Sequence, residues 1–255
     1  MLALAAAACL SGLLVTHAAG EEARVVKVAV EGAFPPFNFL DSNQQLQGFD
    51  VDVAKALCAE ARFECQLVVQ EWTAMIPNLI AGKFDAIISS MSMSAERRAK
   101  VAFTSRYYDS PTVFVKQKDL KALSGDPQEL AGLTLGVTAG TAQAEYAKRF
   151  YPEVETVVFQ ASTDLYKGLS DKVVDVILED KLAIFDWLTN TRAGTCCDFT
   201  GADIKDDEFF GEGAGIAVRQ QDEELRQALD EALVAIKENG KYDEINAKYF
   251  PFSIQ

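Results

Sequence analysis

The chain has 255 residues and a net charge of −14 at pH 7, from 38 acidic and 24 basic side chains. This length allows one large hydrophobic core or two smaller ones. The acidity argues against nucleic acid and anionic membrane surfaces as partners, because both are negatively charged. We therefore expect a freely diffusing protein whose ligand is neutral or cationic.

The first 20 residues predict a secretory signal peptide. Residues 2–15 are apolar and rich in Ala and Leu, and small residues follow them before the first charged ones. Such a stretch is too short to span a bilayer and ends at a small-residue cleavage site. Cys9 leaves lipoprotein-type processing open as an alternative. Cleavage would also remove His17, the only histidine, so we expect no His-based catalysis, zinc site or pH switch in the mature chain.

Strand-like and helix-like segments alternate along the rest of the chain, which predicts an α/β fold with mainly parallel sheets. The expected elements, in chain order, are a strand at 25–30, a helix at 48–61, a strand at 63–69, a helix at 72–81, a strand at 84–88, an extended segment at 109–116, a strand at 133–138, a helix at 141–150, a strand at 155–159, a helix at 162–170, a strand at 173–178, a helix at 181–190, a strand at 216–218, and helices at 222–238 and 242–250. Residues 200–215 are rich in turn formers.

The most informative segment is the end of the buried strand at 84–88. It runs into Ser89, Ser90, Ser92 and Ser94, and Arg97 follows three residues later. Hydroxyls and free backbone groups at a strand end can bind an ammonium, and a guanidinium can grip a carboxylate with two hydrogen bonds. The segment therefore predicts a site for a small zwitterion. We expect hydroxyl and backbone contacts from Ser90 and Ser92, mainly a carbonyl contact from Ser89, and a helix N-cap at Ser94.

A second candidate site lies at the end of the strand at 133–138. Thr138 leads through a Gly turn into a helix that starts near Thr141. The free N–H groups of Thr141, Ala142 and Gln143 would then point outward at the positive end of the helix dipole. This arrangement predicts binding of an anionic group.

These motifs, together with residues 31–39 and 48–52, resemble the polar-amino-acid solute-binding proteins of bacterial ABC transporters. The resemblance is greatest to the branch that binds lysine, arginine, ornithine or histidine, and its motifs occur in the family's order along the mature chain. It implies a type II periplasmic-binding-protein fold, with two lobes, two hinge strands and a ligand cleft between the lobes. Lobe 1 would comprise residues 25–109 and 207–255, and lobe 2 residues 113–206.

The resemblance also implies roles for individual residues. Arg97 would bind the ligand carboxylate, and Asp180 would accept the α-ammonium unless it serves only to cap the next helix. Glu31 would meet a cationic side chain between the rings of Phe34 and Trp72. Because Glu31 is longer than the Asp usual in this branch, the ligand remains open among arginine, lysine, ornithine, histidine and opine-like derivatives. The alternative interpretation is a solvated Glu beside core aromatics.

Of the remaining cysteines, Cys58 and Cys65 stand where the family carries a small disulfide loop. Cys196 and Cys197 are adjacent, and three states remain open for them: a vicinal disulfide, free thiols or intermolecular bonds. A metal site is less favoured, because no histidine accompanies them.

The resemblance implies a periplasmic, monomeric protein that delivers its ligand to an ABC permease, without catalysis and without a cofactor. One alternative is an enzyme similar to the periplasmic cyclohexadienyl dehydratases, with Glu31 as an acid in the cleft. Another is a sensor subunit with the same pocket but a different partner.

Overall fold

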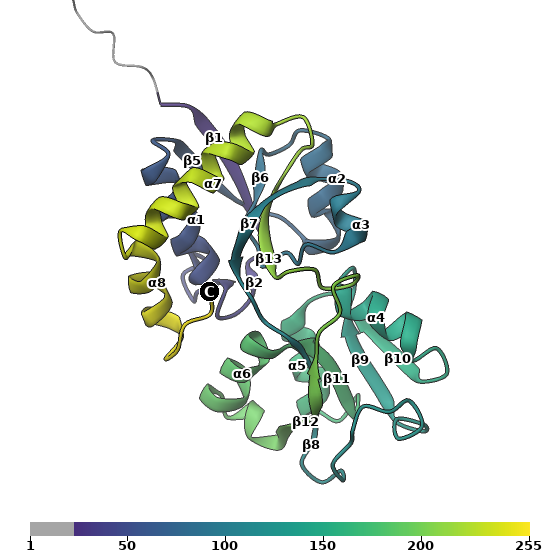
Figure 1. The fold of residues 1–255 in the computed structure, drawn as a ribbon. Helices are drawn as coiled ribbons and strands as arrows, with labels where there is room; N and C mark the ends of the chain where they lie inside the picture. The colour runs from purple at the N-terminus through teal and green to yellow at the C-terminus, as the bar shows by residue number, and fades with distance from the viewer. Residues whose placement is uncertain (1–22) are drawn as a thin grey trace, which may run out of the picture.

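The computed structural model describes residues 23–255, so the predicted signal peptide, Cys9 and His17 lie outside the described part. Two lobes are visible in Figure 1, each built on a five-stranded sheet with helices on both faces. We call the elements around the sheet β5-β1-β6-β13-β7 lobe 1, and those around the sheet β10-β9-β11-β8-β12 lobe 2. No helix within residues 23–255 is long and apolar enough to cross a bilayer.

The elements of lobe 1 come from both ends of the described chain. Its main strands are β1 (Val25–Val30), β5 (Glu64–Val69), β6 (Ala86–Ile87), β7 (Ala102–Tyr108) and β13 (Ala214–Val218). Its helices are α1 (Phe49–Glu60), α2 (Met75–Ile80), α3 (Ala95–Arg98), α7 (Glu223–Glu238) and α8 (Lys241–Tyr249). A small sheet of β2 (Ala33–Phe34), β3 (Asn38–Leu40) and β4 (Leu46–Gln47) lies beside them.

Lobe 2 is formed by the central part of the chain. Its strands are β8 (Thr112–Gln117), β9 (Thr134–Thr138), β10 (Glu155–Phe159), β11 (Val176–Asp180) and β12 (Cys197–Ile204). Its helices are α4 (Ala142–Phe150), α5 (Ser162–Ser170) and α6 (Lys181–Asn190). The chain passes between the lobes at residues 109–111 and again at 205–213.

The parallel strands explain where a ligand site can form. In lobe 1, β1 pairs in parallel with β5 and β6, and in lobe 2, β9 pairs in parallel with β10 and β11. The carboxyl ends of such strands meet at one edge of the sheet, where the following loops collect side chains. Strand interiors are apolar because helices bury both faces, as at Val28 and Ala29, whose side chains have no solvent exposure.

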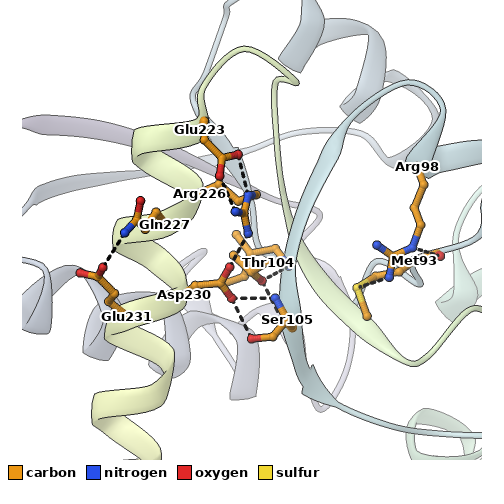
Figure 2. A network of polar contacts seen from close by, with 10 residues as sticks. Met93, Arg98, Thr104, Ser105, Glu223, Arg226, Gln227, Asp230 and Glu231 are labelled. Atoms are coloured by element: carbon orange, nitrogen blue, oxygen red, sulfur yellow. Dashed lines mark hydrogen bonds and ion pairs between the residues drawn. The ribbon is translucent and has the colours of Figure 1, made fainter.

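Helix α7 fixes the strand that leads into the first crossover. The backbone N–H and the hydroxyl of Ser105 in β7 both donate to Asp230 Oδ1 at 2.7 Å, and Arg226 Nη1 donates to Asp230 Oδ2 at 2.7 Å. Figure 2 shows this network between the helix and the strand, with Glu223 pairing with the same arginine. The strand that leads into the first crossover is therefore held to α7 by a shared carboxylate.

The structure differs from the predicted elements at several places. The helix expected at 72–81 is split into a 3-10 turn at Trp72–Ala74, which Glu71 caps by accepting from the N–H groups of Thr73 and Ala74, and the short helix α2. Pro77 in α2 has no N–H, so a continuous ladder of helical hydrogen bonds cannot form through this segment. β11 begins at Val176 rather than at 173 and extends to Asp180. The small sheet of lobe 1 and strand β12 were not predicted, since strands of two or three residues and a strand rich in turn formers carry little periodic signal.

Two disulfides are present among residues 23–255. Cys58 and Cys65 are joined, with Cα atoms 6.0 Å apart, and the bond links the end of α1 to β5. Cys196 and Cys197 form a vicinal disulfide at the start of β12. Of the three states left open for this pair, the structure therefore has the vicinal bond.

We predict that the Cys58–Cys65 bond stabilises the protein by about 2–3 kcal/mol, because it closes a short loop that the unfolded chain would otherwise sample freely. The check is urea unfolding of the mature Cys196→Ala/Cys197→Ala variant, compared before and after reduction. The two samples have the same sequence, so only the bond differs. Equal unfolding free energies, or free thiols at both positions in the oxidised sample, would contradict the prediction.

Candidate functional site

One cavity lies between the two lobes, where the carboxyl ends of the parallel strands face each other. It collects every residue predicted for the ligand site except Ser90. Its lining residues are Glu31, Phe34, Trp72, Ser89, Ser92 and Arg97 from lobe 1, and Thr138, Thr141, Ala142, Gln143, Ser162, Glu179 and Asp180 from lobe 2. Ser162 and Glu179 are the two members that the sequence analysis did not select.

Arg97 is fixed as a buried cation at the wall of this cavity. As predicted, Ser94 caps α3, and its Oγ accepts from the Arg97 N–H at 3.3 Å. The guanidinium Nη1 donates to Ser92 Oγ at 2.7 Å and to the Ser92 carbonyl at 3.1 Å. Burial lowers the pKa of Arg97 to about 10, so the group remains charged at neutral pH. Its Nε has no partner among residues 23–255 and is available to an anionic ligand group.

The Gly140 carbonyl of lobe 2 joins the two lobes. It accepts hydrogen bonds from Arg97 Nη2 and from Trp72 Nε1, each at 3.1 Å. Trp72 also stacks on Arg97, with the guanidinium carbon 5.2 Å from the ring centre. The cavity has a volume of about 40 Å³ in this arrangement.

The first turn of α4 presents backbone donors to the cavity. Gly140 adopts a φ of 67°, which lets the chain turn sharply from β9 into the helix. Thr141 caps α4 through its Oγ1, which accepts from Ala144 N–H at 3.2 Å. The Thr141 N–H closes the turn onto the Thr138 carbonyl at 3.4 Å, so the donors aimed outward are those of Ala142 and Gln143. They lie at the positive end of the helix dipole.

Asp180 combines a capping role with a free carboxylate oxygen. Its Oδ1 accepts from the N–H groups of Leu182 and Ala183 at 2.9 and 3.0 Å, and from the Ser110 hydroxyl at 2.8 Å. None of these bonds uses Oδ2, which has no partner among residues 23–255. The two roles considered for this residue are therefore compatible. Burial is the main cause that raises the pKa of Asp180, to about 6.

Ser90 does not line the cavity, because its hydroxyl is used in the core of lobe 1. Ser90 Oγ donates to Asp50 Oδ2 at 2.9 Å, and its N–H donates to the Tyr107 hydroxyl at 2.8 Å. Ser89 lines the cavity, and its Oγ accepts from the Glu31 N–H at 3.0 Å, while the carbonyl contact to a ligand stays a prediction. The strand end thus has one serine that positions Glu31 and one that anchors the loop.

Glu31 faces the cavity and forms no ion pair with any of residues 23–255. Burial, followed by the charges of Glu71 and Asp50, raises its pKa to about 7. Phe34 lies beside it in the lining and stacks on Phe37, with ring centres 5.5 Å apart. Trp72, the second ring predicted to flank a ligand cation, also lines the cavity but stacks on Arg97. No cluster of His, Cys, Asp and Glu suited to a metal ion occurs within residues 23–255.

Comparison with known proteins gives the same assignment as this geometry. Residues 26–252 match the family described as bacterial extracellular solute-binding proteins, family 3. The chain belongs to this family. It is 38% identical to the L-arginine-binding protein of Pseudomonas aeruginosa, over 99% of this chain and 97% of the relative. It is 32% identical to the histidine-binding periplasmic protein of Escherichia coli, over 90% of this chain and 88% of the relative.

Solved structures agree on the type II fold. A Salmonella typhimurium periplasmic binding protein with high arginine specificity superposes with a TM-score of 0.81 at 28% identity, covering 89% of this chain and all of that one. The two-lobe α/β architecture predicted from the sequence is thereby confirmed. In this family 3 protein, Glu179 and Ser162 were missed because a polar residue inside a buried strand and a serine opening a helix both have ordinary structural explanations.

We predict that Arg97→Ala and Asp180→Asn each weaken ligand binding by about 2–5 kcal/mol, because each leaves a desolvated ligand charge without its partner. Asp180→Asn is the cleaner variant, since Asn caps helices as well as Asp and α6 should stay intact. Calorimetry measures the affinity, and Asp126→Asn, which removes a carboxylate outside the cavity, is the control. Near-wild-type affinity in Arg97→Ala with an unchanged melting temperature would disprove the anchor.

We predict that the ligand-free protein loses stability as the pH rises from 5 to 8. Glu31, Asp50, Glu179 and Asp180 have folded pKa values raised to between about 6 and about 8, mainly by burial. In this window the folded state binds more protons than the unfolded state, so the unfolding free energy falls with pH. Urea unfolding at several pH values checks the slope. Glu31→Gln should make it shallower, and a slope of opposite sign would contradict the assignment.

Proposed function

We propose that the mature protein is a periplasmic solute-binding protein that captures a basic amino acid and delivers it to an ABC permease. The observation that carries the proposal is the charge pattern of one cavity. Arg97 and the first turn of α4 can bind a carboxylate, Asp180 Oδ2 can bind an α-ammonium, and Glu31 is a further carboxylate that no cation within residues 23–255 pairs with.

This pattern matches a zwitterion that carries one extra positive charge. Arg97 and Asp180 compensate the α-carboxylate and α-ammonium, which leaves Glu31 to compensate a side-chain cation. The proposal agrees with the names of the relatives, which bind arginine or histidine. Among the ligands left open by the sequence, arginine, lysine, ornithine and histidine all fit this charge count at a pH where they are protonated.

Capture would follow from closure of the two lobes, which we place at residues 25–109 with 207–255 and at residues 113–206. The ligand's charges engage both lobes, so the bound state favours the closed arrangement, and the permease would recognise that form. Export through the signal peptide and function as a monomer belong to the same proposal. The Trp72 and Arg97 contacts to the Gly140 carbonyl already join the lobes in the form described here.

We propose that the protein performs no catalysis. A dehydratase would need a proton donor at the cleft, and Glu31, with its raised pKa, is the residue that could serve. Incubation with prephenate and arogenate tests this alternative directly, because turnover would favour the enzyme. A sensor subunit would share the pocket and bind the same ligands, so only its membrane partner would differ.

The test of the proposed function is a thermal-shift screen of the mature protein against amino acids and opines, after unfolding and refolding to remove any co-purified ligand. Stabilisation by basic amino acids, and much weaker stabilisation by neutral and acidic ones, is the expected result. A preference for a neutral or an acidic amino acid would show that the basic-ligand assignment is wrong, even though the family assignment would stand.

We predict that Glu31→Gln weakens basic ligands far more than neutral ones. The substitution keeps the size of the side chain and removes its charge, so arginine loses a charge-assisted bond worth about 1.5–3 kcal/mol whereas glutamine does not. Calorimetry with both ligands cancels their shared α-amino and α-carboxylate contacts. Equal losses for arginine and glutamine would exclude Glu31 as the partner of the side-chain cation.

A further inference from the structure

Glu179 is a buried carboxyl group with one unused oxygen. Its side chain is 4% exposed and lines the cavity. Side-chain alternation along β11 places it on the same face as Ile177, which packs in the core of lobe 2. Oε1 accepts from the Asp180 N–H at 2.7 Å, while Oε2 has no hydrogen-bond partner among residues 23–255. Because a buried polar atom without a partner is costly, a ligand group is a reasonable candidate for that partner.

A second unpaired group lies next to Glu179. The hydroxyl of Tyr166 is buried and has no hydrogen-bond partner in the described part of the chain. Tyr166 and Ser162 are four residues apart on α5 and therefore share one helix face, and Ser162 also lines the cavity. Glu31, Ser162, Glu179 and Asp180 line the same cavity. Burial, followed by the charges of Glu179, Asp180 and Glu31, raises the pKa of Tyr166 well above its usual value.

The opposite wall of this neighbourhood is Glu31 in lobe 1. Strand β2, which begins two residues after Glu31, contacts α5 across the cleft. The charge of Glu31 also contributes to the raised pKa of Glu179, which lies at about 8 with burial as its main cause. Neither carboxylate forms an ion pair with another residue in the range 23–255. This end of the cavity therefore has two carboxyl groups, one from each lobe, and no cation from the chain.

We propose that Glu179 is a second side-chain-binding carboxylate and that, with Glu31 opposite, it makes the pocket selective for a guanidinium over an alkylammonium. This inference rests on the proposed function. A guanidinium has five donors in a rigid plane whose edges point in different directions, so it can serve carboxylates on two walls at once. An ammonium has three donors on a single atom and can be satisfied by Glu31 and the hydroxyls alone.

The experiment is calorimetry of the mature protein with arginine, lysine, ornithine and citrulline. Citrulline has nearly the shape of arginine but no charge. The wild type should bind arginine more tightly than the other three ligands. Glu179→Gln should lower the affinity for arginine by about 10-fold or more and that for lysine by less than about 3-fold. Glu155→Gln, which removes an exposed carboxylate at the start of β10, is the matched control and should leave all affinities unchanged.

The ratio of arginine to lysine affinity separates a binding role from a structural one. Both ligands share the α-amino and α-carboxylate contacts, so a merely structural disturbance of β11 would weaken both by the same factor, and that result would overturn the inference. A wild type that binds lysine as tightly as arginine would also overturn it while leaving the proposed function standing. If the wild type binds no basic amino acid, the proposed function itself fails.

A variant that keeps the strand carboxylate provides an independent measurement if Glu179→Gln does not fold. Tyr166→Phe removes only the unpaired hydroxyl behind Glu179 and keeps the ring in the core of lobe 2. We expect it to lower arginine affinity severalfold with little effect on lysine. Unchanged arginine affinity in Tyr166→Phe, together with equal wild-type affinities for arginine and citrulline, would overturn the inference without the Glu179 variant.

Discussion

The carboxylate of Asp50 holds together the loops that form the lobe 1 half of the site. It has no solvent exposure and accepts three hydrogen bonds, from Tyr107 Oη at 2.7 Å, Asn38 Nδ2 at 2.7 Å and Ser90 Oγ at 2.9 Å. Asn38 in turn accepts from the Gly32 N–H at 2.8 Å. One buried charge thus connects α1, the loop that carries Glu31, the serine strand end and the hinge strand. Removing it would leave several buried donors unpaired at once.

The site contains ionisable side chains that are buried from solvent but not fully paired by other groups of the protein. The hydrogen bonds that the Arg97 guanidinium donates within residues 23–255 go to neutral oxygens, and Glu31, Glu179 and Asp180 have raised pKa values because burial disfavours their charged forms. Ion pairs with a ligand of complementary charge would offset the desolvation free energy of these side chains when the lobes close over it. The same buried, incompletely paired groups therefore lower the stability of the ligand-free protein and contribute to the free energy of ligand binding.

The sequence predicted most of the site because the family's motifs place ligand groups at the ends of strands and the first turns of helices. Arg97, Asp180 and the α4 turn lie in the cavity as expected, and all are set by local structure: a cap, a strand end or a Gly turn. Ser90 and Glu179 could not be assigned in this way. Whether a serine beside a strand end faces the cleft or Asp50, and whether a strand carboxylate is paired, depends on residues distant in sequence.

The sequence by itself determined the α/β class, because hydrophobic periodicity is a local property of the chain. Its resemblance to a known family implied the two-lobe type II fold and the anchor roles that we propose for Arg97 and Asp180. Only the tertiary structure decided which groups share the cavity's far end. Glu31 and Glu179 are separated by most of the chain, and Tyr166 comes from a third element. Their meeting depends on how the two lobes pack together, which no local pattern encodes, and it is there that we propose the selectivity for the ligand side chain is set.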